Sequence, residues 1–139
     1  MDDEELLLTV NARFYEAFEE GDLDLLDEVW SHEESVRCVH PGWGTLVGWR
    51  SIRKSWESIL ANGQSIRFSL RNVIPRVYND LGVIVLEEEI VFGGDQVPQI
   101  VRAIATNLFE RSGGEWKMIH HHASPVMLNA GNELSYRFN

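Results

Sequence analysis

Most of this chain's capacity for chemistry lies in its histidines. His40 stands directly before Pro41, and His120, His121 and His122 form a triplet near the end of the chain. An imidazole with an ordinary pKa near ~6.5 can accept a proton at neutral pH, and it is also a common zinc ligand. The sequence therefore offers a proton-transfer site or a metal site.

The spacing of the triplet bears on this choice. In a strand, His120 and His122 point to one face and His121 to the other. If Gly113 and Gly114 form a two-residue hairpin turn, Asn107 lies opposite His120, so Asn107, His120 and His122 share a face. A register slip of one residue would reverse the faces. With His40 they would make a cluster of three histidines. No carboxylate at a diagnostic spacing joins it, so we predict no metal and expect hydrogen bonding or proton transfer instead.

Glu88 is an acidic residue in an apolar stretch. Alternation places it on the strand face of Ile84, Leu86, Ile90 and Phe92, whereas Glu87 and Glu89 share the face of Val83, Val85 and Val91. Both faces are apolar, so the direction of burial stays open. Burial would raise the pKa of Glu88 and make it a general acid, but an ion pair with Arg102 or Arg67 across the sheet is the favoured outcome.

Helical periodicity dominates the first half of the chain. Apolar residues at three-to-four spacing predict a helix that ends at Gly21, a second helix capped by Asp22 that ends near Ser31, and a third with Asn62 and Gly63 as its stop. A short strand over 36–40 and a loop to Gly48 lie between the second and third helices.

Beyond Gly63 the pattern alternates and predicts long strands. Turn signals divide the remainder into strands near 65–77, 83–92, 98–111 and 115–123, and one of these signals is Gly93 Gly94 Asp95. Long antiparallel strands twist and coil, so we expect a strongly curved antiparallel sheet wrapped by three helices.

Composition narrows the class of protein. The chain has 139 residues, a formal net charge of -10 and one cysteine, Cys38. This length suits a single domain over 1–139, and the negative charge disfavours nucleic acid as a partner. The N-terminus is acidic and no apolar run is long enough to span a membrane, so we predict a cytoplasmic protein. Cys38 is expected in the core. Four tryptophans could stack on a planar ligand, although core or interface positions are favoured: Trp43, Trp49, Trp56 and Trp116.

Four motifs resemble those of the nuclear transport factor 2-like superfamily and its SnoaL-like members. They are the segment from Phe14 to Phe18 with Gly21 Asp22 Leu23; Val39 His40 Pro41 Gly42 followed by Gly48, Ile52, Ser55 and Trp56; Thr106 Asn107 Leu108 Phe109; and the run from Gly114 to Pro125. Together they span nearly the whole chain. The resemblance implies a cystatin-like α+β cone around a pocket. Because this fold hosts enzymes and binding modules alike, it does not fix the activity.

The resemblance also suggests site residues. His40 matches the position where ketosteroid isomerases place the Asp of an Asp-Pro pair, their proton-shuttling base. The catalytic Tyr of that family falls at Phe14 here, so steroid isomerisation is disfavoured, with Tyr15 adjacent but on another helix face. Asn107 resembles a pocket-facing polar residue of kinase association domains. A structural histidine that bonds to backbone is the alternative interpretation of His40.

These observations favour a homodimeric pocket protein for a small hydrophobic molecule. If it is an enzyme, it is an isomerase, cyclase or dehydratase that transfers protons on a hydrophobic carbonyl compound and needs no cofactor. The predicted catalytic residues are His40 and His120, and the predicted substrate-binding residues are Tyr15, Asn107, His122, Trp43 and Phe14. The alternative is a non-catalytic ligand-binding or association module. Since one layer of helices covers only one sheet face, we predict that the other face packs against a second copy.

Overall fold

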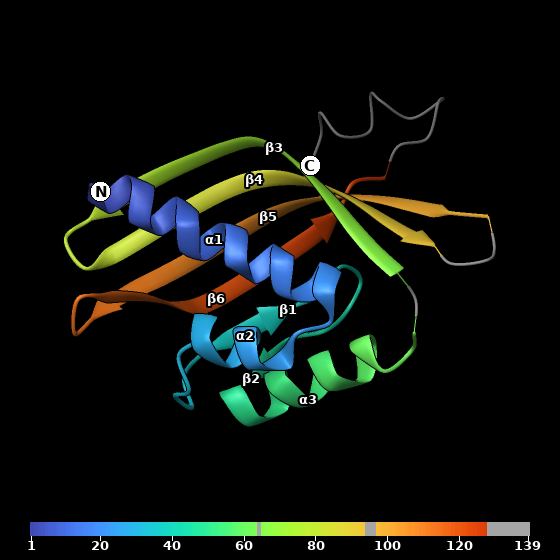
Figure 1. Cartoon of the computed structure of the whole chain (residues 1–139), viewed down its shortest axis with the longest axis horizontal. Helices are drawn as coiled ribbons and strands as arrows, with labels where there is room; N and C mark the ends of the chain where they lie inside the picture. The colour runs from blue at the N-terminus through green and yellow to red at the C-terminus, as the bar shows by residue number, and fades with distance from the viewer. Residues whose placement is uncertain (64, 94–96, 128–139) are drawn as a thin grey trace.

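The structure, a computed structural model, describes residues 1–63, 65–93 and 97–127. Three helices lie on one side of a single curved sheet (Figure 1). The helices are α1 (Asp3–Glu20), α2 (Leu23–Val29) and α3 (Trp49–Leu60). The strands are β1 (Arg37–Val39), β2 (Leu46–Val47), β3 (Ser65–Tyr78), β4 (Leu81–Gly93), β5 (Gln99–Ser112) and β6 (Glu115–Pro125). Their arrangement confirms the expected α+β cone.

Local sequence signals fix both ends of α1. Asp2 accepts a hydrogen bond from the Glu5 amide, and the Glu5 carboxylate accepts one from the Asp2 amide, which makes a capping box. Gly21 ends the helix in the left-handed conformation at φ 65°, where a side chain would be strained. Asp22 then caps α2 through a bond from the Leu25 amide. The predicted end of the first helix at Gly21 and the predicted cap of the second at Asp22 are both confirmed.

The strand order in the sheet is β2-β1-β6-β5-β4-β3. The four long strands form antiparallel hairpins as predicted. The short strand β1 pairs in parallel with β6, so the sheet is mixed rather than wholly antiparallel. Two residues of the expected loop form β2, which pairs with β1. Of the predicted turn at Gly93 Gly94 Asp95, only Gly93 lies within the described residues.

The register between β5 and β6 decides which histidine faces inward. Ser112 pairs with Glu115, so Gly113 and Gly114 do form the predicted two-residue turn. Farther along, Phe109 pairs with Met118 but Leu108 pairs with His120, which leaves Ile119 as an additional residue in a β-bulge. The bulge places Asn107 opposite His121. The predicted alignment of Asn107 with His120 is therefore wrong.

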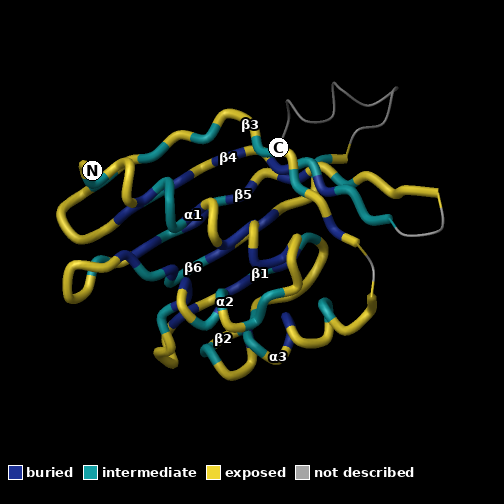
Figure 2. Tube along the Cα trace, in the orientation of Figure 1, coloured by how far each residue is buried: buried dark blue, intermediate teal, exposed yellow. Residues whose placement is uncertain are grey.

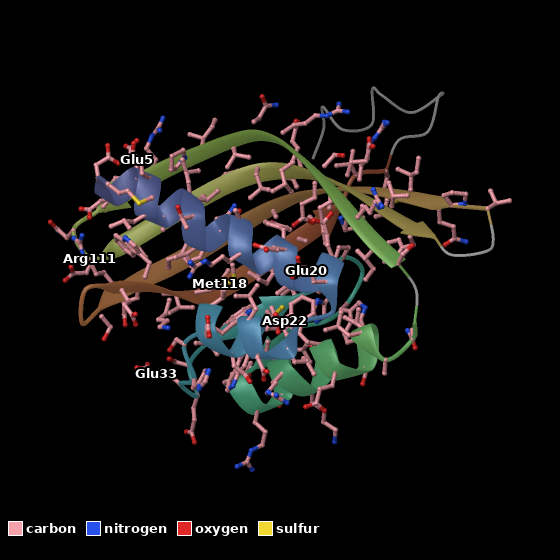
Figure 3. All side chains as sticks on the ribbon, viewed as in Figure 1. Glu5, Glu20, Asp22, Glu33, Arg111 and Met118 are labelled. Carbon is pink, nitrogen blue, oxygen red and sulfur yellow. The ribbon has the colours of Figure 1, made fainter. Side chains whose placement is uncertain are left out.

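Buried residues alternate with more exposed ones along β4 and β5, because only one face of the sheet is covered by the helices (Figure 2). The inner face packs against the helices, and α1 approaches β4 so closely that a Cβ at Gly82 would lie 2.6 Å from Leu7 Cδ1. At the N-terminal end of α1, Arg111 donates hydrogen bonds to Asp3 and Asp80 and ties the helix to the strand ends (Figure 3). Cys38 is buried in the core, as expected. No helix among the described residues is long and apolar enough to cross a membrane.

Candidate functional site

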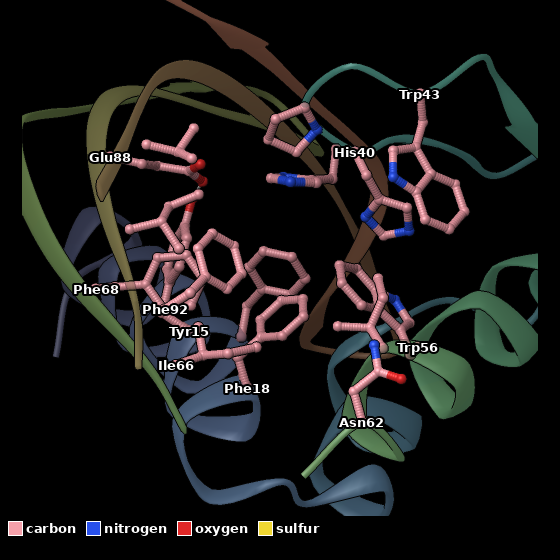
Figure 4. A pocket seen from close by; sticks show the side chains of 16 residues that line it. Tyr15, Phe18, His40, Trp43, Trp56, Asn62, Ile66, Phe68, Glu88 and Phe92 are labelled. Carbon is pink, nitrogen blue, oxygen red and sulfur yellow. Dashed lines mark hydrogen bonds between the residues drawn. The ribbon is translucent and has the colours of Figure 1, made fainter. Parts of the chain in front are cut away.

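A cavity of about 260 Å³ lies between α1, α3, the end of β1 and the inner face of the sheet (Figure 4). This volume is below the ~300–1,000 Å³ usual for drug-sized ligands, so it suits a smaller molecule. Aromatic and aliphatic side chains make most of its wall, among them Phe14, Phe18, Trp43, Trp56, Phe68 and Phe92. The polar side chains that also line it are Tyr15, His40, Asn62, Glu88 and His121.

Glu88 projects from β4 into this cavity and is only 3% exposed. The Tyr15 hydroxyl, on α1, donates a hydrogen bond of 2.6 Å to Glu88 Oε2. Burial raises the pKa of Glu88 from its ordinary 4.5 to about 7, although the Tyr15 bond acts in the opposite direction. Burial beside Glu88 also raises the pKa of Tyr15 well above 10, so the tyrosine stays protonated. The carboxyl can therefore give or take a proton near neutral pH.

The favoured ion pair for Glu88 does not form. Arg102 bonds instead to Glu89 on the other face of β4, at 3.3 Å. The hydroxyl of Tyr15 is the partner of Glu88, and the sequence analysis did not identify it. The spacing of one residue between Phe14 and Tyr15 had suggested different helix faces, yet both side chains line the cavity because α1 lies within the curl of the sheet.

Asn107 connects Tyr15 to His121. Its amide nitrogen donates to Asn11 Oδ1 at 2.8 Å and to the Tyr15 oxygen at 3.1 Å. This orientation turns Asn107 Oδ1 toward His121, whose Nδ1 lies 2.6 Å away and must be the donor. Hydrogen bonds thus run without interruption from His121 through Asn107 and Tyr15 to Glu88.

His40 stands on the wall opposite Glu88 (Figure 4). It is 4% exposed, and its Nε2 lies 2.8 Å from the Ser55 hydroxyl of α3. Its ring packs edge-on against Trp56 and Trp43, at centroid distances of 4.2 and 4.7 Å. Burial lowers the pKa of His40 to about 4, so the imidazole is neutral at pH 7. His40 bonds to a side chain and lines the cavity, unlike the backbone-bonded histidine of the alternative interpretation.

His120 and His122 lie away from the cavity. Both face the outer side of the sheet, where β6 pairs Arg37 with His120 and Val39 with His122. His121 takes the inner position, with its ring 4.8 Å from that of Phe14. The sheet therefore separates His40 from the other two members of the expected three-histidine cluster. Among the described residues, no three His, Cys, Asp or Glu side chains are placed to hold a metal ion.

The predicted tryptophans lie in different places. Trp43 is 48% exposed at the cavity rim, Trp56 is buried in the cavity wall, and Trp116 is buried elsewhere in the core. Sequence reasoning did not select Ser55 or Asn11. The position of Ser55 could have been predicted, since it stands one turn before Ile59 on the inner stripe of α3. Nothing in the sequence spacing indicates that Asn11 contacts Asn107.

A curved sheet closed by helices over a small polar-ended cavity is the architecture of the nuclear transport factor 2-like superfamily. Residues 7–129 match the SnoaL-like domain, and this chain belongs to that family.

Individual relatives come from several kinds of protein. A solved candidate dehydratase of the same superfamily from Streptomyces avermitilis is 34% identical, with a TM-score of 0.85 over 91% of this chain and 98% of that one. A candidate calcium/calmodulin-dependent protein kinase type II association domain from Thiobacillus denitrificans is 29% identical, with a TM-score of 0.75 over 85% of this chain and 93% of that one. The F-box protein SKIP8 of Arabidopsis thaliana is 23% identical over 123 residues, which are 88% of this chain and 51% of that protein. The chain thus spans about half the length of this relative.

Proposed function

We propose that this protein binds a small hydrophobic carbonyl compound in the cavity and transfers protons on it, in an isomerisation, cyclisation or dehydration. The observation that carries the proposal is the Glu88 carboxyl, which is buried in an apolar wall and bonded to Tyr15. Burial raises its pKa to about 7. A carboxylic acid held neutral in this way can donate a hydrogen bond to a carbonyl oxygen. The similarity to a candidate dehydratase supports the same class of chemistry.

The base in this proposal is His40. The Ser55 hydroxyl donates to the Ile52 carbonyl at 2.6 Å, a separation between two oxygens that requires a hydrogen. Ser55 must then accept from His40, so Nε2 carries the proton and Nδ1 keeps its lone pair. Glu88 would polarise the substrate carbonyl, and His40 Nδ1 would take the proton from the adjacent carbon. These transfers need no organic cofactor.

A test without the natural substrate is hydrogen–deuterium exchange. In D₂O, the protein should accelerate exchange at the carbon next to the carbonyl of 4-phenyl-2-butanone, as followed by proton NMR. His40→Ala and Glu88→Gln should each remove most of the acceleration, because one removes the base and the other removes the acid proton. His122→Ala, on the outer face, is the matched control and should exchange like the unchanged protein.

Exchange no faster than in buffer would contradict proton transfer on ketones of this kind. Saturable binding of the ketone without exchange would favour the alternative, a ligand-binding module without catalysis. Unchanged exchange in folded His40→Ala would show that another group is the base.

Self-association is the second candidate function, and the outer face of the sheet supports it. No helix among the described residues covers this face, and three of its apolar side chains are 43% to 48% exposed: Ile74, Val85 and Ile104. The similarity to a candidate kinase association domain points in the same direction. We propose a homodimer packed through this face, with roughly 2,000 Å² or more of buried surface.

Sedimentation at micromolar concentration should report a dimer, and Val85→Glu should dissociate it, because a charge in an apolar interface is costly. The control is a charge change on a helix, away from the outer face: Glu20→Lys, on the exposed end of α1, should leave the dimer intact. Ile59→Glu on α3 would not serve as this control, because Ile59 lines the cavity. A monomer in the unchanged protein would exclude this proposal.

A further inference from the structure

His121 is a neutral imidazole with one nitrogen already engaged. Its Nδ1 donates to Asn107 Oδ1, so the proton sits on Nδ1 and Nε2 carries a lone pair. Burial lowers the pKa of His121 to about 3, which keeps this form at neutral pH. Asn107 cannot rotate its amide without breaking its bonds to Asn11 and Tyr15. The tautomer of His121 is therefore fixed by three neighbouring side chains.

The lone pair of His121 Nε2 opens onto the cavity. His121 lines the cavity, and no described residue donates to Nε2. Among the described residues, the fully buried side-chain nitrogens and oxygens without a partner are the indole nitrogens of Trp30, Trp56 and Trp116. His121 Nε2 is not one of these fully buried atoms, so part of its surface is accessible from the cavity. It can therefore accept a hydrogen bond from a ligand.

The rest of the wall restricts which donor can enter. No lysine or arginine lines the cavity in the part of the chain that the structure describes, and most of the wall is aromatic or aliphatic. Transferring a charged group into such a wall costs far more than transferring a hydroxyl that finds a partner. A neutral hydroxyl therefore matches the acceptor, and a ring-bearing body matches the aromatic wall.

We propose that His121 Nε2 accepts a hydrogen bond from a hydroxyl group of the ligand, so that the cavity selects small, uncharged, ring-bearing hydroxy compounds. The inference rests on the proposed function, because it concerns the same cavity. It adds to that function a second polar group of the substrate: a hydroxyl held by His121 beside the carbonyl held by Glu88. His40 keeps its proposed role as the base, with only the weakly donating Cys38 thiol, at 3.9 Å, near its Nδ1.

The test compares two probes of nearly equal shape, 4-propylphenol and 4-propyltoluene, which differ by a hydroxyl in place of a methyl group. Both are titrated into the full chain labelled with ¹⁵N and followed by NMR. The phenol should bind more tightly, although water solvates it better, and it should move the ¹⁵N signal of His121 Nε2 upfield. The toluene should leave that signal in place. His121→Phe should reduce the preference for the phenol by about tenfold, the value of one hydrogen bond.

His122→Phe is the matched control, since it makes the same change one residue away on the outer face. It should keep the full preference. If both probes bind the unchanged protein equally well and the His121 signal does not move, the inference is wrong while the apolar cavity stands. If neither probe binds, the pocket of the proposed function fails and the inference fails with it. Should His121→Phe not fold, the ¹⁵N signal of the unchanged protein still decides.

Discussion

The inner and outer faces of the sheet use the same residue types for different purposes. On β6, His121 faces inward and is buried, whereas His122 on the next position is exposed. On β4, Glu88 is buried against Tyr15, whereas Glu89 forms ion pairs with Arg71 and Arg102 at the surface. Neighbouring residues that look identical in sequence thus meet opposite dielectric environments.

This contrast shows where the capacity for chemistry comes from. Burial lowers the pKa of His121 to about 3 and raises that of Glu88 to about 7. Both shifts favour the neutral form, because an apolar wall penalises charge of either sign. The inner face therefore holds uncharged donors and acceptors in fixed positions, while the outer face holds solvated charges and exposed apolar side chains suited to association. Three substitutions test this contrast.

The largest effect is expected at Asn107, which joins the inner-face network. Asn107→Ala removes the partner of His121 and one partner each of Asn11 and Tyr15, and it leaves these groups buried. At about 1–3 kcal/mol for each unsatisfied group, we expect a loss of about 3–5 kcal/mol in the free energy of unfolding, measured by urea denaturation. Thr106→Ala, one residue away on the outer face, should cost less than about 1 kcal/mol. Equal losses would mean that the network does not stabilise the inner face.

The next effect is the pH dependence caused by Glu88. Its pKa is 4.5 in the unfolded chain and about 7 in the folded one, so between these values the folded state holds the additional proton. Stability from this group is therefore fully present below pH 4.5 and is lost as pH rises through 7. The loss amounts to about 3 kcal/mol. Below pH 6.5, His40 and His121 act in the opposite direction, because their folded pKa values are lowered.

Glu88→Gln isolates this contribution. Relative to the unchanged protein, the glutamine variant should gain stability by about 3 kcal/mol between pH 4.5 and pH 8, as unfolding curves at a series of pH values would show. Glu87→Gln on the outer face is the control, and its difference from the unchanged protein should stay within about 0.5 kcal/mol over the same range. A difference for Glu88→Gln that does not change with pH would mean that the carboxyl is solvated.

The fold was largely predictable because its signals are local. Caps at Asp2 and Asp22, the stop at Gly21 and the turn at Gly113 Gly114 each act within a few residues. The pairing of Tyr15 with Glu88 was not predictable, because it joins residues 73 positions apart, and the curvature of the sheet determines whether they meet. An ion pair was expected for Glu88 because the sequence shows oppositely charged residues but does not show where α1 lies relative to the sheet.

The register that points His121 inward, rather than His120, was indicated by a break in the alternation of apolar residues in the sequence. In β6, the inward residues have even numbers at Trp116 and Met118 but an odd number at Ala123. The change occurs at the adjacent apolar pair Met118 Ile119. β3 shows the same change, from Ile66, Phe68 and Leu70 to Val73, Pro75 and Val77, across a bulge where Asn72 takes a φ of 52°. A break in alternation marks a bulge, and a bulge reverses every face beyond it.

The smallest expected effect tests how the inner face tunes its acid. Tyr15→Phe keeps the ring and removes the hydroxyl, which donates to Glu88 Oε2 and accepts from Asn107. Because this bond stabilises the ionised carboxylate and lowers the pKa, its loss should raise the Glu88 pKa above 7, as ¹³C NMR titration of the carboxyl carbon would report. The cost in stability should be about 1 kcal/mol at pH 5, where Glu88 is neutral, and larger at pH 8, where the carboxylate loses its donor.

The control for this substitution is Tyr78→Phe, which removes a hydroxyl from a side chain that is 61% exposed at the end of β3. It should change neither the Glu88 pKa nor the stability. A Glu88 pKa that stays the same or falls in Tyr15→Phe would show that burial alone sets the acidity of the cavity, with the bond to α1 serving only to hold the carboxyl in place.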